Sequence, residues 1–341
     1  MSARGSSIAV LGAGSWGTAL AVHLAGQGHR TRLWARSSRC AAELERTREN
    51  SVYLPGVALP ESLSVTDDLA SLADSEIVLV VVPSHGFREV VRSFLSHPSS
   101  ERCRYLVSAT KGIEGGTHAR MSEVSRHEAK KAKAEVCFAV ISGPSFAKEL
   151  VEGSPTAAVI ACDDESAADH LQRILSGGNL RLYSTSDVVG VELGGTVKNV
   201  IAIAAGVVMG LGLGNNARAA LITRGLHEMT RFGIACGGHP ETFSGLAGLG
   251  DLVLTCTSRM SRNQRIGEAL ASGKTLAEIA AGTAMVAEGI RNCKAVLSLA
   301  DSLGLEMPIT EQMVRVLYDG KPPRLAVETL MARELKREVE P

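Results

Sequence analysis

Short apolar runs alternate with longer, more polar stretches along the first half of the chain. The run at 76–82 is almost continuously β-branched or leucine, which is typical of a strand buried on both faces of a parallel sheet. Helical stretches separate many of these runs, and this alternation predicts a doubly wound parallel α/β sheet. The predicted strands are Ser7–Leu11, Thr31–Trp34, Glu76–Val82, Tyr105–Ala109, Val136–Ile141, Thr156–Ala161 and Leu180–Tyr183.

The pattern changes near residue 188, after which only helical periodicity is found. We therefore expect an α/β domain over 1–187 and an all-helical domain over 188–341. The apolar stretch within 199–217 is predicted to be a buried helix rather than a membrane span, because it is short and has polar ends. The helices predicted after residue 187 are Val188–Gly210, Asn216–Phe232, Arg262–Ser272, Thr275–Ala281, Val286–Leu303, Ile309–Tyr318 and Pro323–Arg337.

Composition narrows the class of protein. The 341 residues include 36 Lys plus Arg and 36 Asp plus Glu, and this zero net charge argues against a nucleic-acid partner. Hydrophobic residues make up 45% and charged residues 21%, as in globular proteins. The seven cysteines are widely spaced without a C-x-x-C pair, so neither a disulfide framework nor a metal site is predicted. No signal peptide is apparent at the N-terminus, and we expect a reducing, cytoplasmic location.

Glycine is enriched, with 35 residues. Gly12, Gly14 and Gly17 form a G-x-G-x-x-G pattern between the first predicted strand and a helix over Thr18–Gly26. In that context Gly12 permits a tight turn, Gly14 lets the backbone approach a pyrophosphate, and Gly17 lets helix and strand pack closely. The pattern favours a Rossmann-like dinucleotide-binding domain over a chance turn. A second group of glycines within 206–214 suggests close helix packing in a core that contains few aromatic residues.

The end of the second predicted strand bears on the choice of cofactor. An Asp or Glu at this place would bind the ribose of NAD, but the chain has Arg36 followed by Ser37 and Arg39. An arginine can hold a ribose 2′-phosphate through charge-assisted hydrogen bonds, which favours NADPH. NADH remains an alternative because an arginine can also stack on adenine, and a solvated basic loop is the structural alternative.

Ligands bind beyond the carboxyl ends of strands in an open α/β sheet. Lys111 lies in such a place after the run Tyr105–Ala109, although a lysine that starts a loop is often merely exposed. Gly143 and Ser145 follow another strand and offer backbone N–H groups and a hydroxyl. The alternative for Ser145 is the N-cap of a helix.

The helical half contains stronger candidates. Lys198 and Glu192 are the only charged residues within Val188–Gly210, and a lysine on so apolar a helix can have a lowered pKa suited to proton transfer. A lysine that extends its ammonium to solvent at the helix edge is the alternative. Asp251 follows three glycines and either orients a lysine, accepts a hydrogen bond from a substrate hydroxyl, or caps the next turn.

Ser261 and Arg262 open a helix, with Asn263 next. Free N–H groups, the helix dipole and an arginine together suit a phosphate or carboxylate, while a solvated helix start is the alternative. Lys111, Lys198 and Arg262 form a cationic set that suggests a small anionic substrate, oxidised or reduced beside a nicotinamide.

Eight motifs carry a resemblance to a known family. They run from Gly12 to about Pro308 and so cover nearly the whole chain, and together with their order and spacing they make the chain similar to the bacterial NAD(P)-dependent glycerol-3-phosphate dehydrogenases. The motifs are GAGSWGTALA, NxxYLPG (Asn50–Gly56), ATKGIE, SGPSFAKE, KNVIAI, GLGDLVLTC, SRN and AEG.

The resemblance implies a Rossmann domain followed by a helical domain. It also implies reduction of dihydroxyacetone phosphate to sn-glycerol 3-phosphate, the backbone of glycerophospholipids, by a homodimer. The cofactor contacts it implies are Ser15, Trp16, Arg36, Lys111, Ala147, Arg262 and Glu288. The substrate contacts it implies are Lys111, Gly143, Ser145, Asp251, Ser261, Arg262 and Asn263, with Lys198 as the proton acceptor in the oxidative direction.

Two other functions are weighed against this one. A 3-hydroxy-acid or ketopantoate reductase would have similar architecture, but it would need a carboxylate clamp in place of a phosphate site. A non-catalytic nucleotide sensor of the same fold should have lost a proton-transfer group or the phosphate-binding residues. This chain keeps Lys111, Lys198, Asp251 and Arg262.

Overall fold

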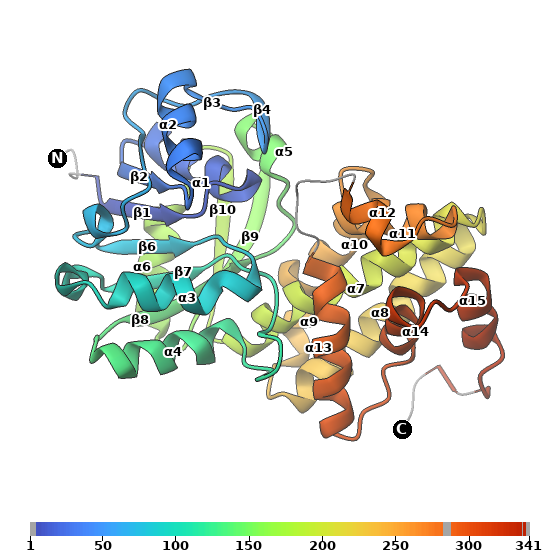
Figure 1. Cartoon of the computed structure of the whole chain (residues 1–341). Coiled ribbons are helices and arrows are strands. Elements are labelled where there is room, and N and C mark those ends of the chain that lie inside the picture. Colours follow the sequence, from blue (N-terminus) through green and yellow to red (C-terminus); the bar gives the residue numbers. More distant parts are fainter. Residues whose placement is uncertain (1–4, 282–287, 336, 339–341) are drawn as a thin grey trace.

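The computed structural model describes residues 5–281, 288–335 and 337–338. Figure 1 shows a sheet flanked by helices, followed by a half built of helices. Eight strands form one sheet in the order β10-β9-β8-β7-β6-β1-β2-β5, and every neighbouring pair is parallel except β8 and β9. The strands are β1 (Ser7–Leu11), β2 (Arg30–Trp34), β5 (Ser64–Thr66), β6 (Ile77–Val80), β7 (Tyr105–Ser108), β8 (Cys137–Ser142), β9 (Thr156–Cys162) and β10 (Leu180–Thr185).

Six of these strands, β5-β2-β1-β6-β7-β8, have the order of a Rossmann sheet. The order reverses between β1 and β6, so the chain leaves those two strands in opposite directions. A crevice opens at such a switch point, beyond the carboxyl ends of the strands. The Rossmann-like prediction is confirmed.

Helices cover both faces of the sheet because its central strands are apolar on both sides (Figure 1). In β1, Ile8 and Val10 pack into the core formed with α1, α5 and α6, whereas Ala9 and Leu11 pack into the core formed with α3 and α4. This alternation is the period of two that a strand imposes. The helices are α1 (Ser15–Gly26), α2 (Ser38–Thr47), α3 (Ser84–Leu95), α4 (Met121–Ala132), α5 (Ala147–Val151) and α6 (Glu165–Leu175), with 3₁₀ turns at Ala70–Leu72 and Pro98–Arg102.

The sheet departs from an all-parallel arrangement at one point. Strand β9 runs antiparallel to β8, with Cys162 opposite Ala139. Between these strands the chain forms the short helix α5 of five residues and then turns back along β8. Strand β5 and the two-stranded pair β3 (Glu49–Asn50) and β4 (Leu54–Ala58) were not predicted, because they lack an alternating pattern of apolar residues.

The helical half is organised around α7, whose residues from Val188 to Val208 are nearly all buried. By length and composition this helix could cross a membrane, but 89% of its most apolar window is buried inside the protein, as in the core helix of a globular protein. No strand occurs after Thr185 among the described residues. The elements are α7 (Val188–Gly210), α8 (Gly214–Ala235), α9 (Pro240–Ser244), a π-helix at Leu246–Gly250, α10 (Asp251–Thr257), α11 (Arg262–Ala271), α12 (Leu276–Ala281), α13 (Glu288–Ser302), α14 (Pro308–Tyr318) and α15 (Pro323–Met331).

Two predictions about this half need correction. The last helix ends at Met331 rather than at residue 337, and part of the predicted helix Val286–Leu303 lies outside the described residues. The expectation of close packing within 206–214 holds for Gly206 and Gly210, where a Cβ would collide with α11. It is wrong for Gly212 and Gly214, which have φ angles of +68° and +83° and form the turn between α7 and α8.

Candidate active site

The glycine turn between β1 and α1 has the geometry that a dinucleotide requires. Gly12 has φ +125°, and a Cβ there would collide with the carbonyl of Val81 at the end of β6. A Cβ on Gly17 would collide with the Gly12 carbonyl, whereas Gly14 faces open space. No side chain caps α1 and its first turn has no acidic residue, so the first N–H groups are free to bind an anion. The turn fits the pyrophosphate of NAD or NADP.

Neighbouring segments hold this turn in place. Ser15 Oγ donates to the Tyr53 carbonyl at 2.6 Å, so the free donor of Ser15 is its backbone N–H. The buried amide of Asn50 donates to the Ala13 carbonyl at 3.0 Å. Trp16 packs against the core on the α1 side of the sheet. Two residues of the NxxYLPG motif thus support the phosphate-binding turn.

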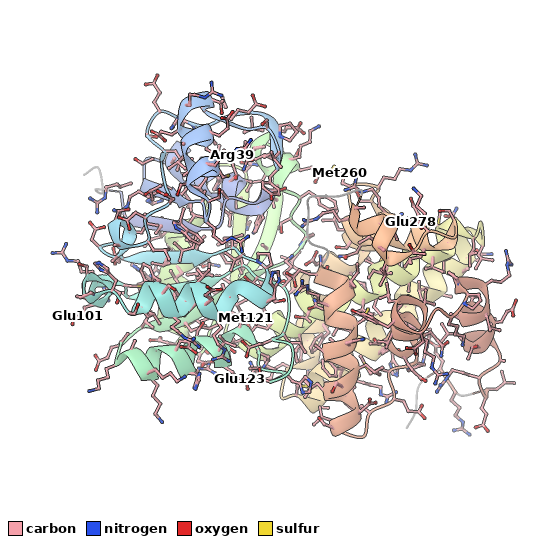
Figure 2. All side chains as sticks on the ribbon, viewed as in Figure 1. Arg39, Glu101, Met121, Glu123, Met260 and Glu278 are labelled. Atoms are coloured by element: carbon pink, nitrogen blue, oxygen red, sulfur yellow. The ribbon has the colours of Figure 1, made fainter. Side chains whose placement is uncertain are left out.

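Arg36 is exposed at the end of β2, as a group that meets a cofactor phosphate should be. Ser37 is already used as the N-cap of α2, where it accepts from Cys40 N at 3.4 Å. Arg39 is exposed on α2 (Figure 2). Partial burial and then the charge of Arg291 lower the pKa of His85, against the opposing charge of Glu288, and Arg36 adds a smaller effect in the lowering direction.

Two lysines and one carboxylate form a buried charged cluster where the two halves meet. Lys111 Nζ lies 2.6 Å from Asp251 Oδ2, and Lys198 Nζ lies 2.8 Å from Asp251 Oδ1. Lys198 also donates to Thr255 Oγ1 at 2.8 Å, and Lys111 to the Gly143 carbonyl at 3.0 Å. The side chains of Asp251 and Lys198 are 2% and 8% exposed, whereas Lys111 is 18% exposed. We infer that the cluster is open mainly on the Lys111 side.

Burial and mutual charge set the pKa values of this cluster. Burial lowers the pKa of Lys198 to about 8, against the attraction of Asp251 and together with the repulsion of Lys111. Burial would raise the pKa of Asp251, but the ammonium groups of Lys111 and Lys198 outweigh it and hold that pKa below its usual range. Lys198 is therefore a proton donor or acceptor close to neutral pH, beside a permanent negative charge.

Glycines bring three segments close enough to form the cluster. A Cβ on Gly194 would lie 2.6 Å from the Ala247 carbonyl, and a Cβ on Gly195 would lie 2.6 Å from Ser142 Oγ. The π-helix at Leu246–Gly250 leads directly into Asp251, and π-helices are frequent at functional sites. Asp251 forms ion pairs with both lysines, which agrees with the alternative in which it orients a lysine.

The segment after β8 contributes backbone rather than side-chain caps. Gly143 has φ +142°, and its carbonyl accepts from Lys111 Nζ and from Ser145 Oγ, the latter at 2.9 Å. Helix α5 begins at Ala147, and its N-cap is Phe146 without a side-chain bond. The alternative that Ser145 caps this helix is therefore wrong.

The start of α11 keeps its predicted cap. Ser261 Oγ accepts from Gln264 N at 3.3 Å. Arg262 is exposed and makes no hydrogen bond or ion pair within the described ranges. Asn263 donates to Asn199 Oδ1 at 2.9 Å, and its own Oδ1 is buried without a partner among the residues described. The free guanidinium of Arg262 at this helix start can bind an anionic ligand, whereas the Asn263 oxygen is buried beside it.

Helix α13 contacts the sheet half at two strand ends. Glu288 accepts from the backbone N–H of Ser84 at 3.0 Å and from its hydroxyl at 2.7 Å, just after β6. Asn292 donates to the Lys111 carbonyl at 3.1 Å, just after β7. From the sequence, Ser84 was placed at the end of a strand without a role and Asn292 was not found, although the spacing of four residues between Glu288 and Asn292 indicates a shared helix face.

A second contact between the halves lies at α4. Glu192 on α7 accepts from the N–H and hydroxyl of Ser122, each at 2.7 Å, and from Arg120 at 2.9 Å. Figure 2 labels Met121 and Glu123 at this end of α4, next to the helical half. Glu192 thus has a structural role in this contact, which leaves Lys198 as the charged residue of α7 that reaches the cluster.

No group of His, Cys, Asp or Glu side chains that could hold a metal ion exists among the residues described.

A Rossmann sheet with a pyrophosphate turn, facing a helical half that carries a buried lysine of lowered pKa, defines a pyridine-nucleotide-dependent oxidoreductase. The comparisons narrow this class. The family model described as NAD-dependent glycerol-3-phosphate dehydrogenase N-terminus matches residues 7–168, and the C-terminus model matches residues 187–328. The chain belongs to the NAD(P)-dependent glycerol-3-phosphate dehydrogenase family.

Relatives match over nearly the whole chain. Glycerol-3-phosphate dehydrogenase [NAD(P)+] of Geobacter sp. (strain M21) is 51% identical over 97% of this chain and 98% of its own length. The crystal structure of glycerol-3-phosphate dehydrogenase from Coxiella burnetii is 42% identical, with TM-score 0.91 over 97% of this chain and 100% of that one. A ketopantoate reductase from Ralstonia eutropha, 17% identical with TM-score 0.59 over 95% of this chain and 99% of that one, shares the fold alone.

Proposed function

We propose that this chain catalyses the reversible reduction of dihydroxyacetone phosphate to sn-glycerol 3-phosphate with NADPH or NADH. The observation that carries the proposal is the cluster of Lys198, Asp251 and Lys111, buried where the helical half meets the strand ends of the dinucleotide sheet. Family membership supports the same activity. The product would supply the backbone of glycerophospholipids.

The chain's own residues would handle the proton and the substrate charge. When bound, the nicotinamide cofactor supplies the hydride for the ketone carbon in reduction and takes it back in oxidation. Lys198 in its ammonium form donates the proton to the developing alkoxide oxygen, and its neutral amine accepts that proton in the reverse direction. Lys111 adds positive charge at the same oxygen, and Asp251 holds both lysines in place.

The remaining site residues would bind and orient. Arg262 and the N-terminus of α11 suit the substrate phosphate, with Ser261 and Asn263 beside them. We place Gly143 and Ser145 in the substrate pocket because Gly143 already contacts Lys111. The cofactor residues we propose are Gly12, Gly14, Ser15, Trp16, Gly17, Arg36, Lys111, Ala147, Arg262 and Glu288.

We propose that Arg36 favours NADPH over NADH, because its exposed positive charge can bind the ribose 2′-phosphate that only NADPH carries.

We also propose a cytoplasmic homodimer, for which a solution mass of twice 35.8 kDa is the test. The domain boundary that we propose lies between residues 187 and 188, where β10 gives way to α7.

The decisive experiment compares Lys198→Ala with the exposed lysine variant Lys130→Ala, following dihydroxyacetone phosphate reduction at the NADPH absorbance band. Loss of the proton donor should lower kcat by about 10²–10⁴-fold, while the NADPH dissociation constant changes little. Near-normal turnover by Lys198→Ala would refute the role of this lysine. Wild-type turnover of ketopantoate or a 3-hydroxy acid instead of dihydroxyacetone phosphate would favour the reductase alternative, and no turnover at all would favour a nucleotide sensor.

A further inference from the structure

Asn292 lies on α13 with its side chain completely buried. Its Nδ2 donates to the Lys111 carbonyl at 3.1 Å and lies 3.5 Å from the Thr196 carbonyl. Lys111 follows β7 in the sheet half, and Thr196 precedes Lys198 by two residues on α7. One amide group therefore contacts the main chain of both segments that carry the lysines of the charged cluster.

The surroundings of Asn292 fix the orientation of this amide. Both contacts are carbonyl oxygens, so the NH₂ group must face them. A Cβ on Gly112 would lie 2.9 Å from Asn292 Oδ1 and 2.8 Å from Ser84 Cβ. The residue after Lys111 is thus a glycine at a close approach of α13, and the Lys111 backbone lies against the amide of Asn292.

Asn292 acts together with Glu288, one helical turn earlier on the same face of α13. Glu288 binds the N–H and hydroxyl of Ser84 after β6, and Asn292 binds the carbonyl of Lys111 after β7. Because β6 and β7 are neighbours in the sheet, this face of α13 spans two adjacent strand ends. The helical half thereby sets where Lys111 leaves the sheet.

We propose that Asn292 is a positioning residue for the reaction: it holds the Lys111 backbone against α7 so that the ammonium groups of Lys111 and Lys198 converge on Asp251. It transfers no proton and need not touch substrate. Asn199 supports the same carbonyl more weakly, at 3.5 Å. The inference rests on the proposed function, because its consequence is a change in turnover.

Asn292→Asp is a sharp test because it preserves shape and replaces the NH₂ donor by a carboxyl. A carboxylate would repel the carbonyls of Lys111 and Thr196, whereas the protonated carboxylic acid can donate one hydrogen bond to them. At pH 8 we expect kcat for dihydroxyacetone phosphate reduction to fall about 10-fold or more, with the NADPH dissociation constant, measured by fluorescence, within about threefold of wild type. The ratio of variant to wild-type kcat should recover at least about threefold at pH 6.

Comparing Asn292→Asp with wild type at each pH isolates the effect of the new carboxyl group. The charged and titratable groups of the surrounding elements, which include Glu288 on α13, His85 on α3, Lys111 after β7, Lys198 on α7 and Asp251 on α10, are present in both enzymes. Asn292→Leu, which has no donor, should lose activity to a similar extent without recovery at pH 6. Thr310→Val is the matched control, since it removes a buried hydroxyl that donates to Glu228 away from the cluster. It should lower thermal stability and leave kcat unchanged.

A merely structural asparagine would give a different result. If Asn292→Asp kept kcat within twofold of wild type per folded molecule, or lost activity equally at pH 6 and pH 8, the positioning role would be refuted. If that variant does not fold, Asn292→Ser replaces it, and a kcat within twofold of wild type refutes the role. Absence of dihydroxyacetone phosphate turnover in wild type would instead refute the proposed function, so the two failures are distinguishable.

Discussion

Asp251→Asn removes the one negative charge shared by the two active-site lysines while keeping the shape of the side chain. In the native protein its two carboxylate oxygens lie 2.6 and 2.8 Å from the Lys111 and Lys198 ammonium groups. The amide can still accept one hydrogen bond, but its NH₂ group would face an ammonium. The substitution therefore tests electrostatics more than packing.

The size of the effect follows from the pKa of Lys198, which is about 8 with the carboxylate present. An opposite charge at this distance favours the charged form by about 1–3 pKa units, so Lys198 should titrate at about 7 or lower in the variant. At about pH 7.5 the protonated fraction would fall from about three quarters to about one quarter or less. Misplacement of both ammonium groups should reduce kcat further, to a total of about 10–100-fold.

The assay is kcat for dihydroxyacetone phosphate reduction across pH 5.5–9.5, followed by NADPH absorbance. In wild type the ammonium form is active, so the reductive rate should fall as pH rises through about 8, and the oxidative rate should rise there. In Asp251→Asn both midpoints should move to lower pH. Asp301→Asn, which changes an exposed carboxylate on α13, is the control. A midpoint that stays in place or moves upward would refute the electrostatic account of the cluster.

Two further substitutions test the packing and the cofactor site. Gly206→Ala should lower the free energy of unfolding by about 1–3 kcal/mol in chemical denaturation, because the new methyl group collides with the Gln264 backbone on α11. Gly26→Ala, where a methyl group meets nothing within 4 Å, should be neutral or slightly stabilising. Equal effects of these two would contradict the packing argument. Arg36→Glu should weaken NADPH binding by about 10-fold or more and NADH binding far less, as measured by fluorescence titration; a parallel loss for both would argue against a 2′-phosphate contact.

Periodicity was sufficient for most of the fold. The strand at 77–80 is continuously apolar and the helix Val188–Gly210 is long, apolar and regular, so local pattern and tertiary structure agree there. Pattern did not predict the direction of β9, because a strand's own period does not say whether its neighbour runs parallel or antiparallel to it. Strands β3 and β5 have too few residues to show a period, and β4 contains Pro and Gly and does not alternate.

The site shows the same division. The spacing of Gly12, Gly14 and Gly17 indicated the pyrophosphate turn. Lys198 was recognisable because a charged residue is unusual on so apolar a helix. Three alternatives were open for Asp251, namely a partner of lysine, an acceptor from a substrate hydroxyl and a cap, until its contacts with Lys111 and Lys198 were known. The sequence predicted that Lys111, Lys198 and Arg262 form one cationic set, but it did not show that Asp251 pairs with both lysines.

Local sequence is enough to specify a strand, a helix, a tight glycine turn and an unusual charge, since each depends on neighbours within a few residues. The convergence of β7, α7, α10 and α13 on one cluster depends on contacts between residues as far apart as Lys111 and Asn292. The lowered pKa of Lys198 likewise arises from burial and from charges on other segments. These properties are set by how the two halves pack, because desolvation and Coulomb interactions act through space and not along the chain.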